Sequence, residues 1–371
     1  MKILFFIPAL NAGGSERVMV TLANQWGKKH SITILTLQNT PSFYQLNENV
    51  KHIKMGLKIP REGWKRLLLL PLIELKRYRY LVNYLKRHDF DFVLSFTNTT
   101  NLLISFWKLF HGKQVVVLSE RADPAARRAW LRGMILGLYR FTDAIVCQNE
   151  YVARYFTAHG YSMPLPILPN PVNFNDIPPT DSIIKRREIV TVGRLSSEKN
   201  QALLISAFSE IAPRYPAYTL KIYGVGPLEN VLSKQIAELG LTNRVFLMGN
   251  KKRVMFEVAQ SDIFVLPSNF EGFPNVLIEA MASGMPVISS DFPTGVARQL
   301  IKDEENGYLF PVGDKASLVK VLEKMLACPD KWAEMGVKNR KLALQYKAAT
   351  VSTKWLKTIE QIKSGFCYAQ H

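Results

Sequence analysis

Short, almost continuously apolar segments alternate with amphipathic segments along most of this 371-residue chain. Strands buried on both faces have this composition, and they occur in parallel sheets whose crossovers are helices. The alternation therefore predicts an α/β fold made of βαβ units. The expected strands are 2–7, 31–36, 92–96, 114–118 and 143–146 in the first half, then 188–192, 218–223, 244–247, 263–267 and 286–289.

A segment rich in Pro, Asn and Asp separates the two series of strands. It begins at Pro169, reads PNPVNFNDIPPTDS, and continues neither a helix nor a strand. Two domains also agree with the length of the chain, at ~100–200 residues per domain. We expect two Rossmann-like domains, 1–172 and 173–371, that face each other across a cleft. We assign a terminal helix over 350–362 to the second domain, although the sequence does not show which domain it packs against.

Cysteine use and hydropathy restrict the class of protein. Cys147, Cys328 and Cys367 are odd in number and far apart, which is typical of neither a disulfide framework nor a zinc site. A reduced, cytoplasmic compartment is the expectation. The N-terminal MKILFFIPALNAGG fits a first strand better than a signal peptide. The least polar stretch, 92–107, is interrupted by Thr-Asn-Thr-Thr-Asn, so no segment is expected to span a membrane.

The chain is strongly basic, with 48 Lys and Arg against 30 Asp and Glu and a net charge of +18. The excess is localised, because 51–90 contains eleven basic and only three acidic residues. Such a concentration indicates an anionic partner at one surface. Nucleic acid, anionic lipid and phosphorylated small molecules all remain candidates.

The first strand-to-helix turn contains Gly13 and Gly14, followed by an apolar helix. Glycines there let the backbone approach a ligand, and the helix start offers free N–H groups to an anion. The alternative is that the glycines only allow a tight turn. The spacing is not G-x-G-x-x-G, and no acidic residue ends the second strand, so a nicotinamide-dependent oxidoreductase is disfavoured.

The second series begins with a strand that leads into VGRLSSEKN, which places Arg194 and Lys199 on one loop. Two cations five residues apart, on a loop that opens a helix, suit a pair of phosphates. By themselves they could equally be ordinary surface charges. About seventy residues later, Glu271 follows a buried strand and Glu279 lies eight positions on, within an apolar helix that begins near Pro274. The apolar neighbours of Glu279 make a purely solvated position less favoured.

The Gly-Gly turn, GRLSSEKN, EGFPNVLIE and SGMPVISSD together resemble the family 4 retaining glycosyltransferases, over nearly the whole chain and in the right order. The resemblance implies two facing Rossmann-like domains (the GT-B arrangement). We expect no cofactor, and the sequence contains no convincing metal-binding cluster. NAGGSERV and SERADP are most similar to bacterial enzymes that build polysaccharide, such as lipopolysaccharide or capsule, or oligosaccharide on a lipid carrier.

The resemblance also implies roles for individual residues. Arg194 and Lys199 would hold the donor diphosphate, Glu271 would lie at the donor sugar, and Glu279 would bind the nucleotide ribose. Backbone of Gly272, Phe273, Pro274, Asn275 and Val276 would assist, and Gly13 and Gly14 would close on the diphosphate from the first domain. A G-x-G-P stretch at 224–227 also recurs in the family.

Arg121 departs from the family pattern. Many relatives carry a histidine after Ser-Glu that contacts the transferred sugar, and here SERADP places Arg121 at that position. We expect Arg121 to contact the sugar or the acceptor. Alternatively, it balances Glu120 and Asp123 in a polar loop.

A competing signature is Asp89-Phe90-Asp91, the Asp-x-Asp pattern with which single-domain glycosyltransferases hold a divalent cation. It precedes a buried strand and follows a basic run, where acidic residues commonly mark a loop boundary. We therefore expect side-chain cations and helix N–H groups, rather than a metal, to neutralise the leaving diphosphate.

Residues 64–87 combine basic and apolar side chains. We expect Pro71 to break or kink this segment, leaving a helix from Leu72 with an apolar stripe at Leu75, Tyr78, Val82 and Leu85. Lys76, Arg77 and Arg79 would then meet an anionic membrane or the diphosphate of a lipid-linked acceptor. The alternative is a core-facing helix with a solvated basic face.

Together these features predict a glycosyltransferase that is associated with the inner face of the cytoplasmic membrane. It would move a hexose or N-acetylhexosamine from a nucleotide-diphosphate sugar, UDP being favoured, to a polyprenyl-diphosphate-linked glycan. The alternatives are a nucleotide-sugar synthase or epimerase with a soluble acceptor, and, because of the charge, a nucleic-acid-binding protein. The latter lacks any recognised nucleic-acid-binding module.

Overall fold

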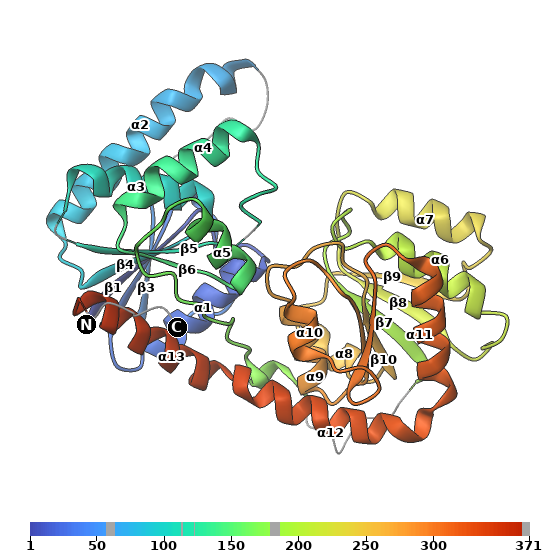
Figure 1. The fold of residues 1–371 in the computed structure, drawn as a ribbon. Coiled ribbons are helices and arrows are strands. Elements are labelled where there is room, and N and C mark those ends of the chain that lie inside the picture. The colour runs from blue at the N-terminus through green and yellow to red at the C-terminus, as the bar shows by residue number, and fades with distance from the viewer. Residues whose placement is uncertain (57–63, 113, 122, 179–185, 366–371) are drawn as a thin grey trace. The chain divides into compact units, whose positions relative to one another are not determined.

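The computed structural model describes residues 1–56, 64–112, 114–121, 123–178 and 186–365, with side chains at all of these except 64–70 and 176. The chain forms two compact units (Figure 1). The first unit comprises Met1–Pro171 together with Ala348–His371, and the second comprises Val172–Lys347. We describe each unit by itself, so the expected cleft between them stays a prediction.

The first unit is a six-stranded parallel sheet in the order β3-β2-β1-β4-β5-β6. The strands are β1 (Lys2–Ile7), β2 (Ser31–Thr36), β3 (Val50–Lys54), β4 (Phe92–Phe96), β5 (Val115–Ser119) and β6 (Ala144–Val146). One face packs on α1 (Gly14–Trp26) and α13 (Ala348–Lys363). The other face packs on α2 (Trp64–Arg87), α3 (Asn98–Phe110), α4 (Ala129–Leu138) and α5 (Glu150–Ala158). The strand order reverses between β1 and β4, which is where such sheets bind ligands.

The second unit repeats the design, with the strand order β12-β11-β10-β7-β8-β9. The strands are β7 (Glu188–Val192), β8 (Thr219–Tyr223), β9 (Val245–Gly249), β10 (Ile263–Leu266), β11 (Val287–Ser290) and β12 (Gly307–Phe310). One face packs on α6 (Gln201–Ile211), α7 (Glu229–Glu238) and α11 (Lys315–Ala327). The other packs on α8 (Val254–Val258), α9 (Asn275–Ala282) and α10 (Val296–Leu300), and α12 (Trp332–Ala343) lies against α9. This confirms the predicted α/β fold of two Rossmann-like domains.

All ten expected strands occur, with ends that shift by at most two residues. Two strands were not expected from the sequence: β3 and β12, one edge strand of each sheet. The first reads VKHIK, in which polar residues interrupt the apolar pattern, and the second, GYLF, is short and begins with glycine.

The terminal helix α13 belongs to the first unit, so its assignment to the second domain was wrong. Trp355 is fully buried, its ring stacks on Phe96 at 6.1 Å, and its Nε1 donates to the carbonyl of Pro169 at 2.8 Å. Trp26 of α1 donates in turn to the carbonyl of Ser352 at 2.9 Å. An apolar stripe on α13 that includes Val351 thus completes the core beneath the first sheet. The boundary at 171/172 agrees with the prediction to within one residue.

Helix α2 runs from Trp64 to Arg87 with Pro71 inside it, so Pro71 does not break the helix. The predicted apolar stripe is right at Leu85, which is buried, and partly right at Tyr78 and Val82, which are half-buried against the core. Leu75 is exposed, whereas the buried positions are Ile73, Arg77, Leu81, Tyr84 and Leu85. Arg77 is 3% exposed and pairs with Glu74, so its assignment to the basic surface was wrong. Lys76 and Arg79 are exposed as predicted. None of the described helices is both long enough and apolar enough to cross a bilayer.

Candidate active site

The loops that follow β7 and β10 lie side by side, because these two strands are neighbours at the point where the order of the second sheet reverses. The first of them, 193–200, contains Arg194 and Lys199. The second, 267–274, contains Glu271. The carboxyl ends of parallel strands at such a reversal form the usual ligand site of open α/β sheets. The fold therefore places the predicted diphosphate and sugar residues in one location.

Lys199 and Glu271 are in direct contact, with Lys199 Nζ 2.6 Å from Glu271 Oε1. The same oxygen accepts a hydrogen bond of 2.7 Å from Ser268 Oγ. The Glu271 residue is 8% exposed, and its carboxylate is thus held by a cation and a hydroxyl within a largely dry loop. Charge-assisted hydrogen bonds of this kind fix the direction of a carboxylate. The sequence placed these residues near each other but did not predict this contact.

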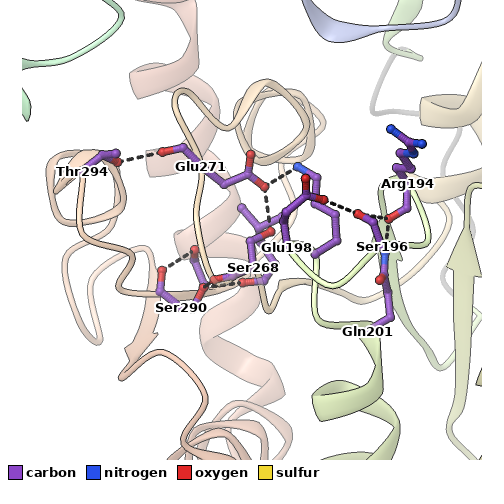
Figure 2. A network of polar contacts seen from close by, with 11 residues as sticks. Arg194, Ser196, Glu198, Gln201, Ser268, Glu271, Ser290 and Thr294 are labelled. Atoms are coloured by element: carbon purple, nitrogen blue, oxygen red, sulfur yellow. Dashed lines mark hydrogen bonds and ion pairs between the residues drawn. The ribbon is translucent and has the colours of Figure 1, made fainter. Parts of the chain in front are cut away.

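Two further hydroxyls brace the backbone of the same loop. Thr294 Oγ1 donates to the carbonyl of Glu271 at 2.9 Å, and Ser290 Oγ donates to the carbonyl of Ser268. Figure 2 shows this chain of contacts from Thr294 through Glu271 to the loop of Ser196. All these hydroxyls are buried, so they replace water as partners of the loop carbonyls. The sequence analysis missed them, although Ser268 stands directly after a buried strand and its following proline.

Arg194 is held by its backbone rather than by its side chain. Gln201 Nε2 donates to the Arg194 carbonyl at 3.0 Å, and Ser196 Oγ donates to the Glu198 carboxylate on the same loop. The guanidinium points away from this network (Figure 2). The Arg194 residue is exposed, so its five donors are available to an incoming anion.

The G-x-G-P stretch packs directly against the Arg194 loop. Leu195 N donates to the carbonyl of Val225 at 3.1 Å, and a β-carbon on Gly226 would lie 2.3 Å from the Leu195 carbonyl oxygen. A β-carbon on Gly224 would lie 1.9 Å from the carbonyl oxygen of Gly193, and Gly224 has φ +137°. The two loops can approach this closely only because both positions are glycine.

Helix α9 begins directly after the Glu271 loop, with Pro274 at its N-cap. Gly272 and Phe273 precede this cap, while Asn275 and Val276 form the first turn. Asn275 N donates to the carbonyl of Phe273 at 3.0 Å, and this first turn is the positive end of the helix next to Glu271. Glu279 is 3% exposed, which confirms that it does not lie on a solvated face.

The first unit carries its own cluster at the carboxyl edge. Gly13 is the N-cap of α1 and Gly14 its first residue. A β-carbon on Gly13 would lie 2.2 Å from the Glu16 carboxylate, so Glu16 folds back over the turn. Burial raises the pKa of Glu16, and the nearby guanidinium of Arg121 opposes that shift.

Arg121 follows β5 and lies over the Phe96 ring, with its guanidinium carbon 5.2 Å from the ring centroid. Burial lowers the pKa of this guanidinium to about 9, while the charges of Glu120 and Glu16 act in the opposite direction. Among the residues that the structure describes, its Nε and Nη1 have no hydrogen-bond partner. The Asp123 carboxylate accepts hydrogen bonds from the Tyr151 hydroxyl and from the backbone N–H of Ala125. These contacts weaken the alternative that Arg121 neutralises the charge of Asp123.

Thr97 follows β4 at the reversal of the first sheet and has φ 72° and ψ 151°. This region is strained for a β-branched residue, and such strain is often found at functional sites. The sequence analysis missed Thr97, because nothing in its neighbours indicates a positive φ.

The Asp-x-Asp pattern has a structural role at Asp91. Its carboxylate accepts from the backbone N–H of Lys2 at 2.8 Å and pairs with Lys363 of α13. These contacts lower the pKa of Asp91, the bond to Lys363 most of all. Among the described residues, no three His, Cys, Asp or Glu side chains are grouped as a metal site would need.

Two family models together match most of the chain. The glycosyltransferase family 4 model matches residues 12–176, and the model of glycosyl transferases group 1 matches residues 175–342. An N-acetylgalactosamine-N,N'-diacetylbacillosaminyl-diphospho-undecaprenol 4-alpha-N-acetylgalactosaminyltransferase of Campylobacter jejuni is 30% identical over 88% of this chain and 90% of its own length. A second Campylobacter jejuni enzyme is 28% identical over 98% of this chain and 100% of its own length. It is named as an alpha-1,4-N-acetyl-D-galactosaminyltransferase that acts on a glycan linked to diNAcBac-PP-undecaprenol.

Solved structures agree on the fold. A sucrose-phosphate synthase from Thermosynechococcus elongatus superposes with a TM-score of 0.83 at 17% identity, covering 98% of this chain and 99% of that chain. The Anabaena protein HepE, solved with UDP and glucose, superposes with a TM-score of 0.81 at 20% identity, covering 97% and 99%. From the matched family models and the extent of the Campylobacter similarity, this chain belongs to the family 4 glycosyltransferases.

Proposed function

We propose that this glycosyltransferase moves a hexose or N-acetylhexosamine from a UDP-sugar to a glycan linked to polyprenyl diphosphate, with retention at the anomeric carbon. The observation that carries the proposal is the contact of Lys199 with Glu271 beside the open guanidinium of Arg194, at the reversal of the second sheet. The names of both Campylobacter relatives support the acceptor class, since both contain an undecaprenol-linked glycan.

Arg194 and Lys199 are the groups that would stabilise the leaving diphosphate. Arg194 offers a planar guanidinium with several N–H donors. Lys199 supplies a compact ammonium charge whose position is fixed by its ion pair with Glu271. The N–H groups at the start of α9 add the positive end of the helix dipole. Cations and dipoles that are in place before the reaction lower the barrier without reorganising during it. The acceptor hydroxyl would lose its proton to the leaving phosphate.

Other residues would orient the donor. Glu271 would bind the donor sugar together with the backbone of 272–276, and Glu279 would bind the ribose. From the first unit, Gly13 and Gly14 would approach the diphosphate, and Arg121 would contact the sugar or the acceptor. Arg121 Nε and Nη1 lack a hydrogen-bond partner among the described residues. This supports that role, because a buried guanidinium gains most from a ligand that completes its hydrogen bonds.

The acceptor implies a location at the inner face of the cytoplasmic membrane. Lys76 and Arg79 are exposed on α2 and would meet anionic lipid or the acceptor diphosphate. Lys76→Gln and Arg79→Gln together should therefore raise the KM for a lipid-linked acceptor.

The decisive test of the active site is Lys199→Ala. Loss of the aimed charge should lower kcat/KM by at least ~10²-fold while the fold is retained. Lys338→Ala is a matched control, since Lys338 also pairs with a glutamate at 2.7 Å but on the exposed side of α12. The turnover of both variants is measured as the release of nucleotide from each of a panel of nucleotide-sugar donors. Near-normal turnover by Lys199→Ala would overturn the assignment.

A further inference from the structure

Helices α2, α3 and α4 cover the same face of the first sheet (Figure 1). Their outer sides expose large apolar residues, which we call the outer apolar surface: Leu75, Phe106, Phe110, Trp130, Met134 and Phe141. Phe110 and Trp130 are each 63% exposed. Single exposed apolar residues are ordinary, but several on adjacent helices mark an interaction site.

Packing of the core does not require these side chains. On α3 the core is served by Ile104 and Trp107, whereas Phe106 and Phe110 lie on the outer side of the helix. On α4 only Ile135 is buried. Its outer side runs through Trp130 and Met134, with Gly133 between them, and a β-carbon on Gly133 would meet no atom within 4 Å. Polar residues would fit these positions equally well.

The surface continues from one helix to the next. Tyr78 of α2 contacts Phe106 of α3, with ring centroids 5.2 Å apart, and Phe106 contacts Phe110 at 5.4 Å. Helix α3 lies against α4 and against the short turn that contains Phe141. Tyr78, Phe106 and Phe110 therefore form one aromatic row, and Trp130, Met134 and Phe141 lie on the helix and turn that pack beside α3.

The charge of this face is predominantly positive. Glu74 of α2, next to Leu75, is partly exposed and pairs with Arg77, and Asp143 pairs with Lys108 at 2.9 Å. No acidic residue occurs between Phe92 and Ser119 or between 124 and 142. Of the two acids between these segments, Glu120 is 1% exposed and Asp123 is already hydrogen-bonded to Tyr151. Exposed cations flank the apolar residues instead: Lys76, Arg79, Arg128, Arg132 and Arg140. Apolar and aromatic side chains with a border in which exposed cations outnumber acids match the interface of an anionic bilayer.

We infer that the outer apolar surface inserts into the headgroup boundary of an anionic bilayer, with Phe110, Trp130 and Met134 as its apolar anchors. The inference rests on the proposed function, since a polyprenyl-linked acceptor lies in that bilayer. The proposed function places only the exposed cations of α2 at the membrane, whereas this inference adds apolar side chains that enter the bilayer. Attachment by charge disappears at high salt, whereas burial of apolar side chains does not.

The test is co-sedimentation with phosphatidylcholine vesicles, with and without phosphatidylglycerol, at low salt and at about 1 M NaCl, where the Debye length is about 3 Å. The wild type should bind anionic vesicles and retain a salt-resistant fraction. The triple variant Phe110→Ser, Trp130→Ser and Met134→Ser should lose at least ~10-fold of the salt-resistant partition coefficient. Val231→Ser with Val337→Ser is the control, because these residues are 58% and 70% exposed on the second unit, and it should bind as the wild type does.

All proteins are also assayed with a water-soluble acceptor, where the triple variant should keep wild-type turnover. Equal salt-resistant binding of the triple variant and the wild type would overturn the inference. A wild type that forms dimers in light scattering, and a triple variant that is monomeric, would also overturn it and assign the surface to a second copy of this chain. Absence of transfer by the wild type would instead count against the proposed function.

Discussion

At the scale of single residues, Glu271 shows how a buried carboxylate is held in one direction. It receives Lys199 Nζ at 2.6 Å and Ser268 Oγ at 2.7 Å on the same oxygen. Burying a charge is costly unless partners replace the lost water, and here a cation and a hydroxyl do so.

Ser268→Ala tests this arrangement. Without the hydroxyl the carboxylate loses one of two contacts that direct it, a bond to a charged group worth about 1.5–3 kcal/mol. We expect kcat/KM for the donor to fall about tenfold, with a melting temperature that is lower by a few degrees because the lost bond is buried. Ser209→Ala is the control, since Ser209 Oγ bonds only a carbonyl within α6. Unchanged steady-state kinetics for Ser268→Ala would show that Lys199 alone orients Glu271.

At the scale of elements, the site depends on two loops of the second unit that cross in close contact. The Arg194 loop and the G-x-G-P loop are joined by backbone hydrogen bonds from Leu195 to Val225 and from Leu228 to Leu195, both of 3.1 Å. A side chain at either glycine would push the Arg194 loop away from its place. The position of Arg194 is therefore set by glycines thirty residues further along the chain.

Gly226→Ala should destabilise the second unit by at least about 2 kcal/mol, because its β-carbon would lie 2.3 Å from a carbonyl oxygen. Displacement of Arg194 should also raise the donor KM. Chemical denaturation and donor titration measure the two effects. Gly240→Ala is the control, because Gly240 has φ +66° and a β-carbon there would meet no atom within 4 Å. This variant should lose only the ~1–2 kcal/mol of stability that a left-handed backbone conformation costs, and its donor KM should not change.

The terminal helix α13 is the second element with a role distant from its place in the sequence. Trp355 fills the core of the first unit between Phe96 and the carbonyl of Pro169. Trp355→Ala should therefore lower the free energy of unfolding by about 3–5 kcal/mol. Trp130→Ala, at a residue that is 63% exposed, should stay within about 0.5 kcal/mol. Thermal unfolding compares the two, and equal stability of both variants would contradict the packing of α13.

At the scale of the whole molecule, the cations that give the net charge of +18 have different roles. Arg194 and Lys199 lie at the candidate active site, whereas Lys76 and Arg79 lie on the outer side of α2. Arg77 is buried and Lys108 pairs with Asp143 at 2.9 Å, so these cations serve the fold. Total charge therefore cannot by itself identify a partner, and the location of each cation decides its role.

Transfer should persist after removal of divalent metal. The cations of the site and the helix N–H groups would carry the charge of the leaving diphosphate, and Asp91 is engaged by Lys2 and Lys363. Enzyme treated with EDTA and then assayed without added metal should retain most of its nucleotide release. Loss of activity that Mg²⁺ or Mn²⁺ restores would return the Asp89-x-Asp91 hypothesis to consideration.

The sequence by itself determined what depends on neighbouring residues. Apolar runs located ten of the twelve strands, and glycine-rich turns and charged loops located Arg194, Lys199 and Glu271, since strand ends and loop residues are local properties. Only the tertiary structure decided which unit α13 joins, which face of α2 is buried, that Lys199 pairs with Glu271, and that Arg121 lies over Phe96. Each of these contacts joins segments distant in sequence or depends on what packs against a helix. Periodicity shows that a helix has an apolar side, but the partner that covers this side is chosen by the packing of the whole unit.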